Sequence, residues 1–522
     1  MTDKHELLIL PNHGDSSIVL SEASSSIVAR GREDAGSLMV RKSEPRLLSA
    51  FKSLLALGGL REKSGFAERG DAIVQFGMGC DYFFGEGVPQ DFPQAAIWFR
   101  KAAEQGHTGA QINLGTAYSR GLGVPQDYTQ SALWYRKAAE QGDTGAQHGL
   151  GIRYAKGQGV PRDLSQAAIW YRKAADQGFA TAQYDLGWLY NQGAGIPQDY
   201  AQAAAWYRKA AEQGYAGAQF RLGVMYYNGH GVPQDDAQAA AWYRKAAEQD
   251  YAAAQCSIAM LCLLGRGVPK DFVQAAVWSR KAAEQGYAPA QCDLGRLYDL
   301  GQGVSQSYEE AAFWLRKAAE QGYVGAQFRL GVMYDLGHGV PKDYAQAIIC
   351  YRKAAEQGHA GAQYSLGWHY NQGEGIPHSA DQAANWYRKA ADQGDARAQF
   401  GLGVLLYDGR GIPQNYAEAA SWYRKAADQG DVMAQYNLGW LYYTGRGVPQ
   451  NYTEAAILYR KAAEKGSPEA QYNLGRLYDL GQGVSQSYEE AAYWLRKAAG
   501  QGHSEAKSNL DLFYARGLLA KG

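Results

Sequence analysis

Residues 107–142 read HTGAQINLGTAYSRGLGVPQDYTQSALWYRKAAEQG, and this stretch decides the fold because it is one copy of a repeat. The tract K-A-A near its end recurs at a constant spacing of 36 residues, with its lysine at positions 101, 137, 173, 209, 245, 281, 317, 353, 389, 425, 461 and 497. Twelve copies without an insertion indicate one structural unit stacked on its neighbours, since an insertion would have to be accommodated at every interface.

The first half of the copy predicts a helix with one apolar face. Ala110, Leu114 and Tyr118 stand at i, i+4 and i+8. Gly115 leaves room beside Leu114 for a second helix to approach. The first helix should end near Gly121, because glycine accepts the left-handed backbone that closes a helix.

The second half of the copy predicts another helix. Asp127, followed by Gln130, has the spacing of an N-cap with a partner three residues on. Tyr135 and Ala139 should face the core, while Trp134 fills the space between repeats. Ten tryptophans at this one phase favour packing over a cofactor or base-stacking platform, namely Trp98, Trp134, Trp170, Trp206, Trp242, Trp278, Trp314, Trp386, Trp422 and Trp494.

The charged residues of the second helix predict an outer face. Arg136 and Lys137 stand four and three residues before Glu140. Contacts at these spacings are worth about 0.2–0.5 kcal/mol each on a helix surface. We therefore interpret this face as solvated.

Composition excludes several classes of partner. Lys plus Arg and Asp plus Glu number 52 each, so the chain lacks the positive charge of a nucleic-acid binder. It has no run of about 18 apolar residues, which argues against membrane insertion. Its first residues also lack the longer apolar run of a secretory signal, so we expect a soluble, cytoplasmic protein. The cysteines are odd in number and irregularly spaced, which favours reduced thiols. They are Cys80, Cys256, Cys262, Cys292 and Cys350.

The complete pattern is A-x-x-x-L-G-x-x-Y, then G-x-G-V, D, A and W, then K-A-A-x-x-G. It resembles the Sel-one-like repeat (SLR) family, which is related to tetratricopeptide repeats, over about residues 71–522. The resemblance implies an all-α, right-handed α/α superhelical solenoid of antiparallel helix pairs. It also implies a role as adaptor or scaffold for protein complexes, often in bacteria. Secreted members of the family carry a disulfide in each repeat, and this chain departs from them.

The repeat sets the expected domain boundaries. We predict twelve 36-residue helix-turn-helix repeats over residues 71–502. After them, a lone first-type helix carries Asp511 in place of the small glycine. A polar substitution of this kind is typical of a terminal repeat, so residues 503–522 should form a C-terminal capping helix.

The N-terminal part of the chain differs from the repeats. Residues 1–43 mix serine, charge and short apolar runs without sustained periodicity, so we predict disorder there. Residues 46–57, RLLSAFKSLLAL, are amphipathic, and residues 66–70, FAERG, match the phase of the A-A-E-Q-G tract. Residues 44–70 should therefore form a degenerate helical N-terminal cap.

The first helices should line the concave groove, by similarity to tetratricopeptide repeats. Their ligand-facing phases, which include those of Thr116 and Ser119, vary along the chain and carry aromatic, Arg and Asn side chains. This is the composition of binding hot spots. We predict a protein or peptide partner bound by Trp188, Asn191, Tyr227, Arg296, Asp299, Asp335, Trp368, Tyr407, Trp440, Tyr443 and Arg476. Since these residues need not support the fold, we expect Trp188 and Tyr227 to be replaceable by Ala with little loss of stability.

The phase of Ile112 leaves two interpretations open. Its rings, such as Tyr184 and Phe220, either pack against the adjacent repeat or bind the partner.

Catalysis has little support in the sequence. The ten histidines are scattered, none stands i,i+4 to another on a helix, and we find no metal-ligand cluster, nucleophile motif or cofactor motif. We therefore expect a monomeric interaction scaffold that is not an enzyme. A dedicated inhibitor or immunity protein for one toxin or enzyme stays open as an alternative, and a hydrolase as a more remote one.

Overall fold

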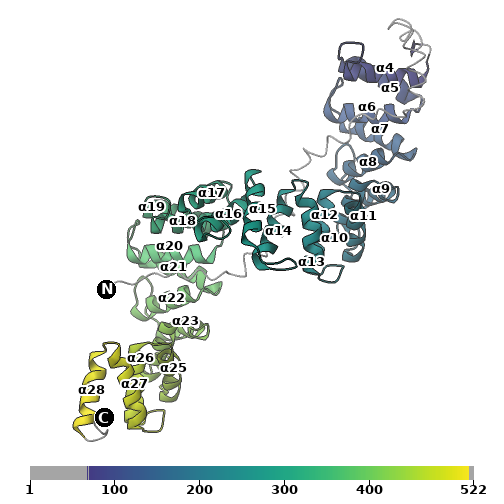
Figure 1. The fold of residues 1–522 in the computed structure, drawn as a ribbon. Helices are drawn as coiled ribbons and strands as arrows, with labels where there is room; N and C mark the ends of the chain where they lie inside the picture. The colour runs from purple at the N-terminus through teal and green to yellow at the C-terminus, as the bar shows by residue number, and fades with distance from the viewer. Residues whose placement is uncertain (1–66, 69, 517–522) are drawn as a thin grey trace. The chain divides into compact units, whose positions relative to one another are not determined.

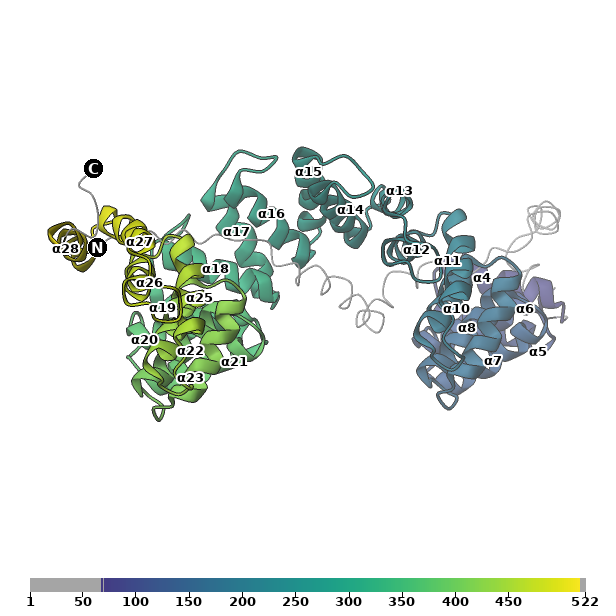
Figure 2. The same cartoon turned by 90° about the horizontal axis from the view of Figure 1, so that it is seen from below.

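The computed structural model of the protein describes residues 67, 68 and 70–516. This part of the chain contains 25 α-helices and no β-strand, and it divides into two compact units. Consecutive helices form pairs, and the pairs follow one another along the chain as an all-α solenoid (Figures 1 and 2).

The first unit ends at Tyr287, and its described part holds twelve helices. Its pairs are α4 (Ala72–Phe84) with α5 (Phe92–Glu104), α6 (Thr108–Arg120) with α7 (Tyr128–Glu140), α8 (Thr144–Lys156) with α9 (Leu164–Asp176), α10 (Ala180–Gln192) with α11 (Tyr200–Glu212), α12 (Ala216–Asn228) with α13 (Asp236–Ala247), and α14 (Ala252–Leu264) with α15 (Phe272–Glu284).

The second unit begins at Ala288 and holds thirteen described helices. Its pairs are α16 (Ala288–Leu300) with α17 (Tyr308–Glu320), α18 (Val324–Leu336) with α19 (Tyr344–Glu356), α20 (Ala360–Gln372) with α21 (Ala380–Asp392), α22 (Ala396–Asp408) with α23 (Tyr416–Asp428), α24 (Val432–Thr444) with α25 (Tyr452–Glu464), and α26 (Pro468–Leu480) with α27 (Tyr488–Gly500). The last helix, α28 (Ser504–Ala515), follows these pairs.

The helix ends lie where the sequence predicts them. Gly121 closes α6 with φ of 69°, a left-handed conformation that costs glycine little. At the start of α7, the Asp127 carboxylate accepts a hydrogen bond from the backbone N–H of Gln130 at 3.0 Å. A side chain thus satisfies one of the amide groups that a helix start leaves without an intrahelical partner.

Small residues let the paired helices approach closely. A Cβ added at Gly115 of α6 would stand 3.3 Å from the ring of Tyr135 and 3.4 Å from the carbonyl oxygen of Ser131, both on α7. Tyr135 is almost fully buried, as predicted. Trp134 beside it is also buried, which confirms that this tryptophan belongs to the packing.

Two glutamines per repeat connect each helix pair to the preceding one. The buried Gln111 of α6 donates through Nε2 to the carbonyl oxygen of Ala103 in α5, at 3.2 Å. Its Oε1 accepts from Nε2 of Gln141, at the end of α7, at 2.8 Å. The beginning of one helix therefore meets the end of its partner, so the pair is antiparallel. Equivalent Gln-to-Gln bonds recur in eleven of the twelve copies.

The outer face of the second helices is solvated, as predicted, with Arg136, Lys137 and Glu140 all exposed, but its contacts differ from the expected ones. Arg136 donates to the hydroxyl of Tyr154 in the next repeat at 2.6 Å. The Lys137 ammonium lies 4.2 Å from the ring centre of Trp134, a cation–π geometry. The two cations thus contact the aromatic side chains of Tyr154 and Trp134. An ion pair with the exposed Glu140 would add little, because solvent screens such pairs.

Other predictions are confirmed in part or lie outside the description. Within the described residues none of the five cysteines is in a disulfide, and Cys262 and Cys350 are buried. The predicted disorder of residues 1–43 and nearly all of the predicted cap at 44–70 lie outside the described residues.

Candidate functional site

The predicted binding residues lie on first helices of both units, which we describe separately. Trp188 and Asn191 stand on α10 and Tyr227 on α12, in the first unit. The second unit carries the other eight, namely Arg296, Asp299, Asp335, Trp368, Tyr407, Trp440, Tyr443 and Arg476. All eleven are half-buried except Trp440, which is 36% exposed.

Trp188 is built into the fold. Its ring packs between two core clusters, one containing Leu186 and the other Leu222. Its indole N–H is buried and has no hydrogen-bond acceptor among the described residues. The expectation that Trp188 is dispensable for stability therefore does not fit its position, because the ring spans consecutive helix pairs. Trp368 is placed similarly, against the cluster that contains Leu402.

The rings at the phase of Ile112 also pack between helices. Tyr184 lies 5.6 Å from Tyr207 of its own repeat and 5.2 Å from Tyr215 at the start of the next, measured between ring centres. Phe220 lies in the same way between Tyr243 and Tyr251. These contacts favour the packing interpretation over partner binding.

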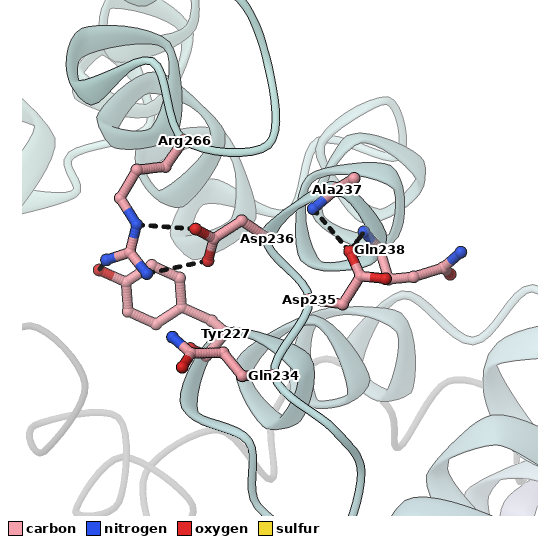
Figure 3. Close-up of polar contacts among 7 residues, drawn as sticks. All are labelled: Tyr227, Gln234, Asp235, Asp236, Ala237, Gln238 and Arg266. Carbon is pink, nitrogen blue, oxygen red and sulfur yellow. Dashed lines mark hydrogen bonds and ion pairs between the residues drawn. The ribbon is translucent and has the colours of Figure 1, made fainter.

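Tyr227 is held by an arginine from the following repeat (Figure 3). Nη1 of Arg266 donates to the Tyr227 hydroxyl at 2.8 Å. The same guanidinium donates to both carboxylate oxygens of Asp236, through Nε at 2.8 Å and Nη2 at 2.9 Å. Such a two-pronged pair is strong and fixes the geometry of both partners. Tyr227 is therefore part of an internal clamp, which we call the Arg266 clamp (Tyr227, Asp236 and Arg266).

Asp335 belongs to a polar cluster that joins three helices, in which its two partners are buried. Its Oδ2 accepts from the hydroxyl of Tyr351 on α19 at 3.2 Å, and its Oδ1 lies 3.6 Å from Nε2 of His369 on α20. The His369 ring is fully buried, and its Nδ1 lies 3.0 Å from the carbonyl oxygen of Glu374. Burial, with the Asp335 carboxylate nearby, raises the pKa of Tyr351 well above its usual value. These contacts connect α18, α19 and α20, although Nε2 of His369 is buried without a hydrogen-bond partner among the described residues.

Sequence reasoning missed His369 and a similar residue, His148. Nε2 of His148 lies 2.7 Å from Oδ2 of Asp185, across two consecutive first helices. The sequence nevertheless marks His369 as unusual, because other repeats have an apolar residue at the same position, such as Leu189 and Met225. A histidine at a core phase requires a buried polar partner.

The remaining charged candidates make local contacts. Burial raises the pKa of the Asp299 carboxyl, while the nearby Arg329 and His338 act in the opposite direction. The Arg296 guanidinium lies 3.9 Å from Asp293, one turn earlier on α16.

Trp440, the most exposed of the eleven candidates, lies among aromatic side chains around the end of α24. Trp440 stacks on Tyr443 with ring centres 5.8 Å apart, and Tyr443 meets Tyr452 edge-on at 5.4 Å. Arg446, just after α24, donates through Nη1 to the Tyr407 hydroxyl of α22 at 3.3 Å. Tyr407 in turn meets Tyr416 edge-on at 5.2 Å. We call these residues, Tyr407, Tyr416, Trp440, Tyr443, Arg446 and Tyr452, the α24 aromatic surface.

Within the described residues, no group of three or more His, Cys, Asp or Glu side chains is arranged to hold a metal ion. No helix in this part of the chain is long and apolar enough to span a membrane.

Comparisons with known proteins agree with this architecture. The model of the Sel1 repeat family matches twelve consecutive segments, 72–107, 108–143, 144–179, 180–215, 216–251, 252–287, 288–323, 324–359, 360–395, 396–431, 432–467 and 468–503. No protein with a curated description matches the chain.

The chain is also similar to solved structures. The chain is 38% identical to c5321, a protective antigen of uropathogenic Escherichia coli with an SLR fold, with a TM-score of 0.74. That match covers 86% of this chain and 97% of c5321. A Sel1 repeat protein of Oxalobacter formigenes is 36% identical over 59% of this chain and 90% of its own, with a TM-score of 0.49. The immunity protein PA5088 of Pseudomonas aeruginosa is 24% identical over 41% of this chain and 82% of its own, with a TM-score of 0.29. With twelve repeat matches in one uninterrupted series and a full-length structural relative, this chain belongs to the Sel1 repeat family.

Proposed function

We propose that the protein is an interaction scaffold that binds a segment of a partner protein on the α24 aromatic surface. The observation that carries this proposal is the exposure of Trp440, stacked on Tyr443, on a first helix. Trp188 and Trp368 stand at the same phase of their repeats but pack against the core. Trp440 therefore has the most surface to offer a partner.

The composition of this surface supports the proposal. Tryptophan, tyrosine and arginine are the residues most enriched among binding hot spots. Fixed rings lose little conformational entropy on binding, and Trp440 and Tyr443 are already stacked on one another. The other sequence candidates of the second unit, including Arg296, Asp299 and Arg476, would then contribute secondary contacts.

The test compares binding and stability in the same variants. Partners are first identified by affinity purification and mass spectrometry and then titrated with purified chain. Replacing Trp440 and Tyr443 together by Ala should weaken binding by about 2 kcal/mol or more, while the thermal midpoint shifts by only a few degrees.

Trp422→Ala is the matched control, because this tryptophan is buried in the core, and its loss should lower stability first. Unchanged affinity in the Trp440 and Tyr443 double variant would contradict the proposed site.

A dedicated inhibitor would bind through the same kind of surface and differ in affinity. A scaffold should bind several partners at micromolar strength, and an inhibitor one partner at nanomolar strength or better. The likeness to an immunity protein is too distant to favour that alternative. An enzyme would show turnover abolished by a single His or Glu substitution.

A further inference from the structure

The Arg266 clamp has a counterpart in the second unit, five repeats later in the sequence. Tyr227 corresponds to Tyr407, and Arg266 corresponds to Arg446. Both arginines donate through Nη1 to the matching tyrosine hydroxyl, at 2.8 Å in the first unit and 3.3 Å in the second. The chain therefore contains the same arginine–tyrosine contact twice, and the two copies can be compared directly. We call this contact, with the first residue of the helix beside it, the arginine frame.

In the first unit the frame holds a carboxylate. Asp236, the first residue of α13, places its two oxygens 2.8 and 2.9 Å from two nitrogens of Arg266 (Figure 3). These hydrogen bonds raise the pKa of Arg266. The guanidinium is thus neutralised from within the chain.

In the second unit the acid is missing from the frame. Tyr416, the first residue of α23, stands where Asp236 stands in the first unit. The Arg446 guanidinium lies 5.7 Å from the ring centre of Tyr416. Among the residues that the structure describes, no carboxylate forms an ion pair with Arg446, and Asp408, beside Tyr407 in sequence, is paired with Arg410 at 3.0 Å. The Arg446 guanidinium is therefore not paired with any carboxylate among the described residues.

We propose that Arg446 binds a carboxylate of an acidic segment in the partner protein, in the position that Asp236 fills within the first unit. Charge complementarity supports this occupant, since an arginine fork matches a carboxylate and the first unit shows that match in the same frame. Trp440 and Tyr443 would contact the residues that flank the acid. This proposal deepens the proposed function and rests on it.

The probe is a random twelve-residue peptide library displayed on phage and selected against the full chain. Peptides that bind are expected to be enriched in Asp and Glu. In titrations of synthetic peptides, replacing the selected acid by its amide should weaken binding tenfold or more, and Arg446→Gln should cause the same loss. Arg266→Gln, the matched change in the first unit, should leave the affinity unchanged.

Two exchanges between the frames make the test reciprocal. Tyr416→Asp supplies Arg446 with an internal acid, as Asp236 does for Arg266, and should weaken peptide binding tenfold or more without removing the arginine. Asp236→Tyr frees Arg266 and should create a second, weaker site, so that the stoichiometry rises from one peptide per chain to two. Melting curves establish that each variant is folded, and the two exchanges test the proposal even if Arg446→Gln unfolds.

The outcomes separate the two proposals. A selection that yields no peptide at all overturns the proposed function and this site with it. Selected peptides that lack acids, or that lose affinity with Trp440→Ala but not with Arg446→Gln or Tyr416→Asp, overturn the carboxylate site alone and leave the scaffold function standing.

Discussion

At the residue scale, Lys465 interrupts the series of Gln-to-Gln bonds that join the two helices of each pair. It stands where the other copies have the second glutamine, and its Nζ donates instead to the carbonyl oxygen of Gly430 at 2.6 Å. Oε1 of Gln435 is consequently buried without a hydrogen-bond partner among the described residues. A buried acceptor without a donor costs stability, so the contact between α24 and α25 should be weaker than that within the other helix pairs.

Lys465→Gln should therefore stabilise the protein by about 0.5–1.5 kcal/mol, because it supplies the missing donor. Gln429, which bonds both Gln399 and the carbonyl oxygen of Gly394, shows that a glutamine can also replace the lysine contact. Thermal melting measures the effect. Gln429→Lys is the reverse control and should destabilise; equal midpoints for both variants would contradict the explanation.

Asp299→Asn tests a half-buried charge at the same scale. Burial raises the pKa of Asp299 in the folded state above its unfolded value, so folding favours the protonated carboxyl. The stability that the protonated Asp299 carboxyl contributes is present below the pKa of the unfolded state, near pH 4. It is lost as the pH rises through the pKa of the folded state. The amide variant should be more stable than the parent chain at pH 7, with a difference that disappears in acid. Denaturant titrations at both pH values measure it.

At the element scale, the two helices of a pair pack closely because a small residue on the first helix faces a large residue on the second. A Cβ at Gly223 of α12 would stand 2.6 Å from the ring of Tyr243 on α13. In the sixth copy the glycine is replaced by Ala259, and the facing tyrosine by Ser279, both of them buried. The pair of residues, rather than either one, keeps α14 and α15 close.

Gly223→Ala should accordingly cost about 1–3 kcal/mol through overpacking. The double variant with Tyr243→Ser should lose less unfolding free energy than the sum of the losses of the two single variants. The reason is that the sixth copy has alanine and serine at these two positions. Chemical denaturation of the four proteins gives the coupling energy. Gly77→Ala on α4 is the control, because its Cβ meets no atom within 4 Å, and it should stabilise by about 0.5–1 kcal/mol. If the free-energy changes of the two single variants simply add up in the double variant, this explanation of the pair is wrong.

At the scale of the whole molecule, stability should be a sum over neighbouring repeats. The main packing in each unit runs between consecutive helices, and the core forms a series of clusters rather than one centre. In such an array each repeat is supported by its nearest neighbours. Damage to one repeat should therefore remain local.

Tyr207→Ala tests this locality. The ring is almost fully buried in the first unit, and its loss should cost roughly 3–5 kcal/mol. Hydrogen exchange should show protection falling in α10 to α13 and unchanged protection in α22 to α28. A uniform loss across all helices would instead indicate that the chain unfolds as one cooperative unit.

The sequence by itself determined the repeat length, the helix ends and the residues that separate helices. These features depend on local chemistry, since Gly121 closes its helix and Asp127 caps the next through contacts within a few residues. The 36-residue period then placed Tyr135 and Trp134 in the core, because identical units must bury identical faces.

Only the tertiary structure decided which polar and aromatic side chains remain available to a partner. Trp188 and Trp440 share one phase, yet the first packs between repeats and the second is exposed. Arg266 and Arg446 share another phase, and only the first has an acid in its fork. Their partners come from neighbouring repeats, where single substitutions alter the surroundings without changing the period. A pattern within one repeat therefore fixes the fold, whereas the proposed binding surface depends on pairs of residues in different repeats.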